Sequence, residues 1–148
     1  MKTFTHNELC ELMREHGVYG YADPSDEVYV SPTRKYFLGT FVDELTADLS
    51  AKGILEWRSE GGDCDDFGGW VWNHASQMNA RMRAPAGIAV GRFKYVQMTG
   101  QGHAIGFAVH ISTRRLTFLD RVKQNGVTRI CEVKLSQSER QSCLSWFV

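Results

Sequence analysis

The sequence predicts one α+β domain in which N-terminal helices pack on an antiparallel sheet. A chain of 148 residues with 43% hydrophobic residues can bury one core. Apolar residues recur at helical spacing in the first half of the chain, and from Ile88 the spacing becomes that of strands. Helices first and strands afterwards is the order of an α+β domain, so we expect residues 1–148 to form a single domain.

The first helix is expected over residues 7–16, with Asn7 as its cap and Gly17 just past its end. A loop rich in tyrosine follows over residues 18–31, where an Asp-Pro-Ser-Asp run indicates a turn.

The second helix is expected to begin at Ser31-Pro32, because serine caps helices well and proline suits the first helical position. It should end near Lys52-Gly53. A third helix should begin at Cys64 and close before Pro85.

Four strands are expected over residues 88–98, 103–110, 115–120 and 127–135. Asn125-Gly126 separates the last two and is a strong hairpin signal. The strands should therefore form an antiparallel meander.

The start of the third helix carries the most unusual sequence, Gly61-Gly62-Asp63-Cys64-Asp65-Asp66-Phe67. A thiol at a helix N-terminus is easily ionised, because the backbone N–H groups and the helix dipole stabilise negative charge. The three carboxylates oppose this effect, so they are either solvated, cap the helix or hold a cation. The other cysteines, Cys10, Cys131 and Cys143, are interpreted as packing residues.

A nucleophilic thiol needs a base and a group that orients the base. His103 opens a buried strand and can face a cleft, whereas His110 lies seven residues later and therefore on the opposite face. Asp120, at the end of the next strand, could accept a hydrogen bond from the imidazole. Glu132 on the last strand is the alternative orienting residue.

Gly62-Asp63-Cys64-Asp65-Asp66-Phe67, followed by Gly102-His103-Ala104 and an acid at a strand end, resembles the papain-like and transglutaminase-like cysteine peptidase superfamily. Within it, the pattern is most similar to the calcium-dependent papain-like domain of the Marasmius mushroom agglutinin and its bacterial and phage relatives. The resemblance implies a papain-like fold with Cys64 as nucleophile, His103 as general base and acid, and Asp120 as the orienting residue.

The same resemblance gives the aspartates a second interpretation, because acids near the cysteine bind calcium in the mushroom relative. Carboxylate oxygens suit Ca²⁺, so Asp63, Asp65 and Asp66 are candidate metal ligands and calcium is the one possible cofactor. A helix cap remains the alternative. The side-chain donor of an oxyanion hole stays open among Ser59, Trp57 and Tyr29, with the Cys64 backbone N–H as the other donor.

These features predict a cysteine hydrolase that cleaves a peptide or protein through a thioester. A cell-wall amide hydrolase is one alternative. Another is a non-catalytic binding module or inhibitor, such as a phage protein that blocks a host protein, with a contact surface formed by Trp57, Trp70, Trp72 and Tyr29.

The composition limits the kinds of partner and the cellular compartment that we expect. Net charge is zero, which argues against nucleic-acid binding, and no apolar run is long enough for a membrane span. Without a signal-peptide pattern, a cytoplasmic location is expected.

Overall fold

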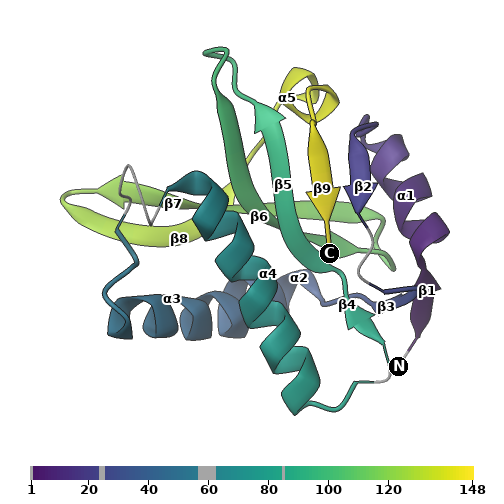
Figure 1. Cartoon of the computed structure of the whole chain (residues 1–148), viewed down its shortest axis with the longest axis horizontal. Helices are drawn as coiled ribbons and strands as arrows, with labels where there is room; N and C mark the ends of the chain where they lie inside the picture. The colour runs from purple at the N-terminus through teal and green to yellow at the C-terminus, as the bar shows by residue number, and fades with distance from the viewer. Residues whose placement is uncertain (1, 24–25, 57–62, 85) are drawn as a thin grey trace.

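A computed structural model of the chain describes residues 2–23, 26–56, 63–84 and 86–148 and contains two β-sheets (Figure 1). The smaller sheet has the order β1-β3-β4, and the larger has the order β2-β9-β5-β6-β7-β8. The strands of the smaller sheet are β1 (Thr3–Thr5), β3 (Val28–Val30) and β4 (Gly87–Ile88). Those of the larger sheet are β2 (Tyr21–Asp23), β5 (Val90–Val96), β6 (Gly102–His110), β7 (Arg115–Gln124), β8 (Val127–Val133) and β9 (Ser145–Phe147).

The observed strands correct the predicted fold class. Strands begin at Thr3, before any helix, and the segment predicted as a tyrosine-rich loop contributes β2 and β3. Pairing is also mixed, since β2 runs parallel to β9 and β3 runs parallel to β4. The prediction of an α+β, papain-like domain with N-terminal helices on one antiparallel sheet is therefore wrong. Short strands near the two ends of the sequence, β1, β2 and β9, each pair with a segment that is distant in the chain.

The meander itself has the predicted order. The strands β5 to β8 are joined by antiparallel pairing throughout. The predicted hairpin turn is confirmed, because Asn125 and Gly126 have φ angles of 50° and 76°, as a two-residue turn between twisted strands requires.

The helices are α1 (His6–Glu15), α2 (Arg34–Tyr36), α3 (Val42–Ala51), α4 (Cys64–Arg81) and α5 (Gln137–Gln141). A π-helical turn, η1 (Phe37–Phe41), joins α2 to α3. The beginning of α4 at Cys64 confirms the predicted start of the third helix. Within the described ranges, no helix is both long and apolar enough to cross a membrane.

Two helices begin at a different cap from the one predicted. Thr5 caps α1 in a reciprocal pair with Glu8, because this threonine has the required extended backbone. Thr33 caps α2 in place of Ser31. The Ser31 hydroxyl instead donates to Val109 O at 2.5 Å and accepts from Ile111 N, which ties this segment to the end of β6.

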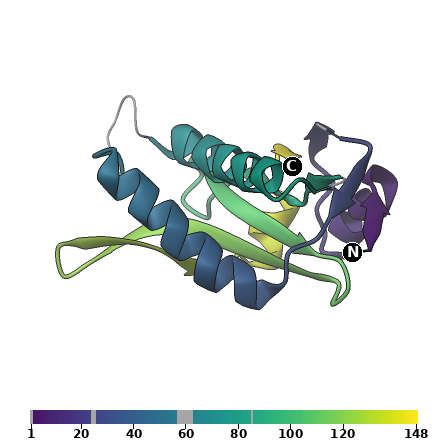
Figure 2. The same cartoon turned by 90° about the horizontal axis from the view of Figure 1, so that it is seen from below.

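The larger sheet has one apolar cluster on each face. Val90, Ala108 and Leu119 point toward α3 and α4, whereas alternate residues such as Phe93 and Phe107 point toward α1 and Trp146. Figures 1 and 2 show α4 lying along β5 and β6, with α1 on the opposite side beside β2 and β9. The long helix α4 therefore places its two ends at different positions over one face of the sheet.

Candidate functional site

The amino end of α4 is capped by its own aspartate. Asp63 Oδ1 accepts hydrogen bonds from Asp65 N at 3.1 Å and Asp66 N at 3.3 Å. These bonds satisfy two of the N–H groups that a helix start leaves unpaired. Cys64 follows the cap as the first helical residue and is half-buried. The sequence motif is thus a helix start, as predicted, with Asp63 in the capping role.

His103 and Asp120 form a hydrogen-bonded pair across β6 and β7. His103 Nε2 lies 2.7 Å from Asp120 Oδ2, and Asp120 Oδ1 accepts from Arg121 N at 2.8 Å. The ring of Tyr95 meets the His103 ring edge-on at 5.9 Å between centroids. Both carboxylate oxygens are engaged, so the imidazole is held in one orientation and Nδ1 is the ring nitrogen that a further partner would meet.

Cys64 is not hydrogen-bonded to this pair. In the described part of the chain, no hydrogen bond connects the Cys64 thiol with His103. Strand alternation places His103 on the face of β6 that carries Ile105 and Phe107. Burial raises the pKa of Tyr95 to about 12, and Asp120 and Cys64 both lie close enough to Tyr95 to add to this shift. The roles assigned to Cys64, His103 and Asp120 stay predictions.

Glu132, the alternative orienting residue, has other partners. Its carboxylate bonds to the guanidinium of Arg34 and the ammonium of Lys134. The acid that contacts His103 is Asp120.

The remaining histidines have structural partners or lie in the core. His110 is buried, lies 2.7 Å from Pro32 O and 2.8 Å from Thr117 Oγ1, and its pKa is lowered by burial. It is on the face opposite to His103, as predicted. His16 at the end of α1 lies 2.8 Å from Arg114 O. Neither residue belongs to the site.

Arg121 is a site residue that the sequence did not reveal. Its Nη2 donates to Asp63 O at 2.9 Å and its Nη1 to Glu56 O at 3.4 Å. The guanidinium lies over the rings of Phe67 and Trp70, at 5.0 Å and 5.8 Å from their centroids. It therefore connects β7 to the beginning of α4. Only its position next to Asp120 in the sequence could have indicated this role.

Two of the three aspartates predicted as calcium ligands have carboxylates with other contacts. Asp63 caps the helix, and Asp65 lies 3.6 Å from the ammonium of Lys94. Across the described ranges, no group of three or more His, Cys, Asp or Glu side chains could hold a metal ion. The interpretation of Asp63 as a cap is supported, and calcium binding by Asp63, Asp65 and Asp66 stays a prediction. Of the proposed oxyanion donors, Trp57 and Ser59 lie outside the described residues, and Tyr29 is buried in the core.

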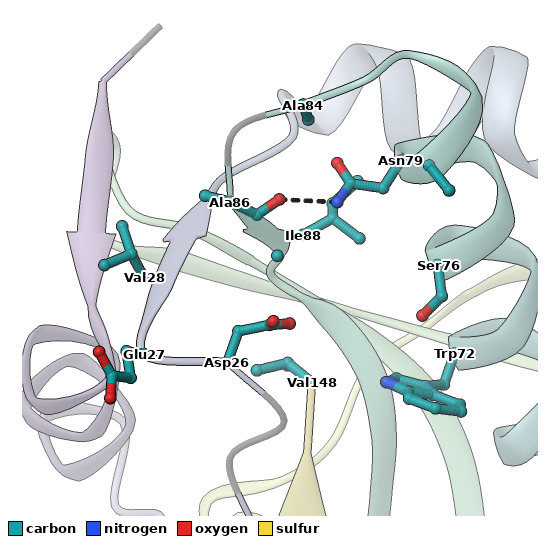
Figure 3. Close-up of a pocket in the computed structure, with 12 residues that line it drawn as sticks. Asp26, Glu27, Val28, Trp72, Ser76, Asn79, Ala84, Ala86, Ile88 and Val148 are labelled. Carbon is teal, nitrogen blue, oxygen red and sulfur yellow. Dashed lines mark hydrogen bonds between the residues drawn. The ribbon is translucent and has the colours of Figure 1, made fainter.

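The carboxyl half of α4 borders a cavity of about 590 Å³ (Figure 3). The Asp26 carboxylate, the Ser76 hydroxyl and the indole of Trp72 surround it, and Glu27, Asn79 and apolar side chains including Val148 line the rest. Asn79 Nδ2 donates to Ala86 O at 2.7 Å and so ties α4 to the segment before β4. Among the described residues of the predicted contact surface, Trp70, Trp72 and Tyr29, Trp72 lines this cavity, and Trp57 lies outside the described residues.

Comparison with solved structures shows the same fold in a fungal lectin. The Polyporus squamosus lectin, in a structure with the bound human-type influenza-binding epitope Neu5Aca2-6Galb1-4GlcNAc, has a TM-score of 0.64 and 16% identity. A structure of a PSL1a-E64 complex has a TM-score of 0.63 and 14% identity. Each match covers 99% of this chain but only 49% and 50% of the matched chains, so this chain spans about half their length. No protein-family model and no curated protein sequence matches the chain.

These comparisons correct the predicted family and activity. The two proteins that share the fold are described as a lectin and as PSL1a in complex with E64, and neither is described as a peptidase. The assignment to the papain-like cysteine peptidase superfamily is therefore wrong. The predicted function as a cysteine hydrolase, with peptidase or amidase activity, is wrong as well. Nothing in the comparisons supports a thiol protease, a calcium-dependent protein or a phage protein. The error arose because a short cysteine motif and a distant histidine carried the whole assignment.

Proposed function

We propose that this chain is a non-catalytic binding module whose ligand occupies the cavity along the carboxyl half of α4. The observation that carries the proposal is the mixed lining of this cavity, with a carboxylate, a hydroxyl and an indole beside apolar side chains. Ligand sites of this kind combine apolar walls with a few converging polar groups. A ligand with several hydroxyl groups can stack on Trp72 and bond to Asp26 and Ser76.

Glycans are the first ligand class to test. The similar fungal lectin is bound to a sialylated epitope, and this chain corresponds to half of that lectin's length. A protein ligand is the alternative, because the cavity is open and its rim includes the exposed side chains of Glu27 and Val28.

The test is calorimetric titration of the chain with sialylated and neutral oligosaccharides. Trp72→Ala should weaken binding at least tenfold, which corresponds to about 1.4 kcal/mol. Tyr19→Ala is the matched control, because Tyr19 is an aromatic residue that is 71% exposed and does not line the cavity. Binding unchanged by Trp72→Ala would place the ligand elsewhere, and the absence of binding to every glycan would reject this ligand class.

A second proposal concerns Cys64, His103 and Asp120, which we propose to form a thiol site that binds electrophilic ligands without turnover. It is supported by the position of Cys64 as the first residue of α4, directly after the Asp63 cap. The bonded His103–Asp120 pair nearby could accept the thiol proton at Nδ1. A protein with a similar fold, PSL1a, forms a complex with E64, which makes E64 a suitable probe of this site.

Alkylation by iodoacetamide tests this second proposal. The Cys64 proton passes to a base, the sulfur forms a bond to the methylene carbon, and the C–I bond breaks with loss of iodide. Cys10, Cys131 and Cys143 serve as internal controls, because burial raises the pKa of each of these thiols. Cys64 should react at least tenfold faster than Cys131 at pH 7, and E64 should protect it. Equal rates at the two cysteines would reject the proposal.

A further inference from the structure

We infer that the cavity along the carboxyl half of α4 selects glycans that carry free amino groups and disfavours acidic glycans. This inference rests on the proposed function as a binding module and names the kind of ligand for the same cavity. It begins from the charges of the lining. Among the described residues that line the cavity, the charged side chains are Asp26 and Glu27, and both are acidic. Such a lining attracts a protonated amine and repels the carboxylate of a sialic acid.

The Asp26 carboxylate lies where a ligand would meet it. Asp26 N donates to the hydroxyl of Tyr29 at 2.9 Å, and Tyr29 is fully buried, so core packing holds the backbone at this position. A Cβ on Gly87 would overlap Asp26 Oδ2, which shows that the carboxylate rests directly against the backbone of β4. Figure 3 shows the carboxylate directed toward the side of the cavity that holds Trp72 and Ser76. A charged acceptor therefore faces the ligand space from across α4.

The wall formed by α4 is uncharged in the described lining. Positions i, i+4, i+7 and i+8 share one face of this helix and form the wall: Trp72, Ser76, Asn79 and Ala80. The indole of Trp72 meets the ring of Phe147 edge-on, with 5.6 Å between the ring centroids. An indole attracts a cation and also stacks on a sugar ring. An amino sugar in the cavity would thus meet a carboxylate on one side and an indole on the other.

Basic side chains close to this wall have other positions. Arg92 lies over the ring of Phe147, at 4.7 Å from its centroid. Arg81 and Arg83, at the end of α4 and just beyond it, are exposed and do not line the cavity. Because Asp26 and Glu27 are exposed as well, water and salt screen their attraction for a cation. We therefore expect a preference of about fivefold for a charged amine over a neutral amide.

Calorimetric titration of the full chain at about pH 6, where carboxylates are ionised and amines are protonated, tests the inference. The probes are tetraglucosamine and tetra-N-acetylglucosamine, which share a sugar backbone and differ in charge. In low salt, the chain should bind tetraglucosamine about fivefold more tightly. Salt at about 1 M should remove most of this preference, because the Debye length falls to about 3 Å. Sialyllactose should bind more weakly than lactose.

Variants assign the preference to the acidic lining. Asp26→Asn removes the charge with little change of shape and should reduce the preference to about twofold or less. Gly87→Ala should also reduce it, because the new Cβ displaces the carboxylate and leaves its charge in place. Asp43→Asn is the matched control, since Asp43 is exposed on α3 and does not line the cavity. If Asp26→Asn does not fold, the salt dependence of the original chain decides.

The outcomes distinguish the inference from the proposed function. If tetraglucosamine binds no more tightly than the acetylated probe, while Trp72→Ala still weakens the binding of both, the inference is overturned and the binding module stands. If no glycan binds, or if Trp72→Ala changes nothing, the proposed function itself is rejected. Tetralysine that binds as tightly as tetraglucosamine would also overturn the inference, because the cavity would then recognise a cation on a peptide.

Discussion

The two ends of α4 are held in different ways. At the amino end, charged groups close around the helix start, with Asp63 as cap, Arg121 on the backbone and Lys94 near Asp65. Along the carboxyl half, a side-chain bond from Asn79 to Ala86 O spans the edge of a cavity of about 590 Å³. The first end is held by polar contacts, and the second borders an open cavity. The thiol site that we propose lies at the first end of this helix, and the ligand site that we propose lies along its carboxyl half.

The middle of α4 packs on β6, and Gly106 of β6 is the residue at which this packing is tightest. A Cβ on Gly106 would lie 2.7 Å from both methyl groups of Val71, which is fully buried. Gly106→Ala should therefore destabilise the chain by about 1–3 kcal/mol and disturb both ends together. Urea unfolding gives the magnitude. Gly69→Ala is the control, because nothing lies within 4 Å of its Cβ and alanine favours helices. Equal destabilisation by both substitutions would show that α4 does not pack as described.

Removing the cap should affect the amino end alone. Asp63→Ala deletes the acceptor for Asp65 N and Asp66 N and should cost about 1 kcal/mol in the free energy of unfolding. Chemical-shift changes in the first turn of α4, with none around Trp72, would confirm the separation of the two ends. Asp63→Asn should retain most of the stability, because asparagine is an equally good cap. Changes that extend to Trp72 would contradict the comparison.

At the other end, Asn79→Ala should loosen the rim of the cavity. The substitution removes the bond to Ala86 O, which is worth about 0.5–1.5 kcal/mol. We expect a smaller loss of stability than for Gly106→Ala and faster hydrogen exchange in β4, with Cys64 alkylation unchanged. If the rate of Cys64 alkylation changed by as large a factor as hydrogen exchange in β4, the two ends of α4 would not be independent.

The smallest expected effect is a pH dependence from the middle of α4. Burial lowers the pKa of His74, although Asp48 and Glu44 partly oppose this, and Nε2 is a buried nitrogen with no hydrogen-bond partner among the described residues. The unfolded chain therefore binds the proton more readily than the folded one, so stability is complete above about pH 6.5 and falls as the pH drops through the folded pKa. His74→Gln should make the loss of stability between about pH 7 and pH 5 shallower. The free energy of unfolding is measured by urea titration at both pH values. If its change between them is the same in His74→Gln as in the original chain, the pH dependence comes from His6 and His110, whose pKa values burial also lowers.

Local signals predicted the elements whose partners are near in sequence. The start of α4 at Cys64 followed from its cap and periodicity, and the β7–β8 hairpin followed from Asn125-Gly126. The strands β2, β3 and β9 have three residues each, which is too short for any periodic pattern. Their positions depend on partners far away in the chain.

The candidate site was predictable to the same degree. The hydrogen bond between His103 and Asp120 was expected from two neighbouring strands, and the structure contains it. Arg121 and the cavity beside Trp72 were not predictable, because both depend on how α4 crosses the sheet. The family assignment failed for a related reason. It used the identity and order of a few residues, whereas the similarity to the lectin lies in the shape of the whole backbone.

The parallel pairing of β2 with β9 has a consequence for folding kinetics. Tyr21–Asp23 meets Ser145–Phe147, and β9 also pairs with β5, so the sheet joins early and late segments through one short strand (Figure 1). Contacts between such distant segments lower the rate of folding, because a long loop must close before they form. During synthesis, the meander from β5 to β8 can assemble first, and β2 must wait for β9 before its edge of the sheet is complete.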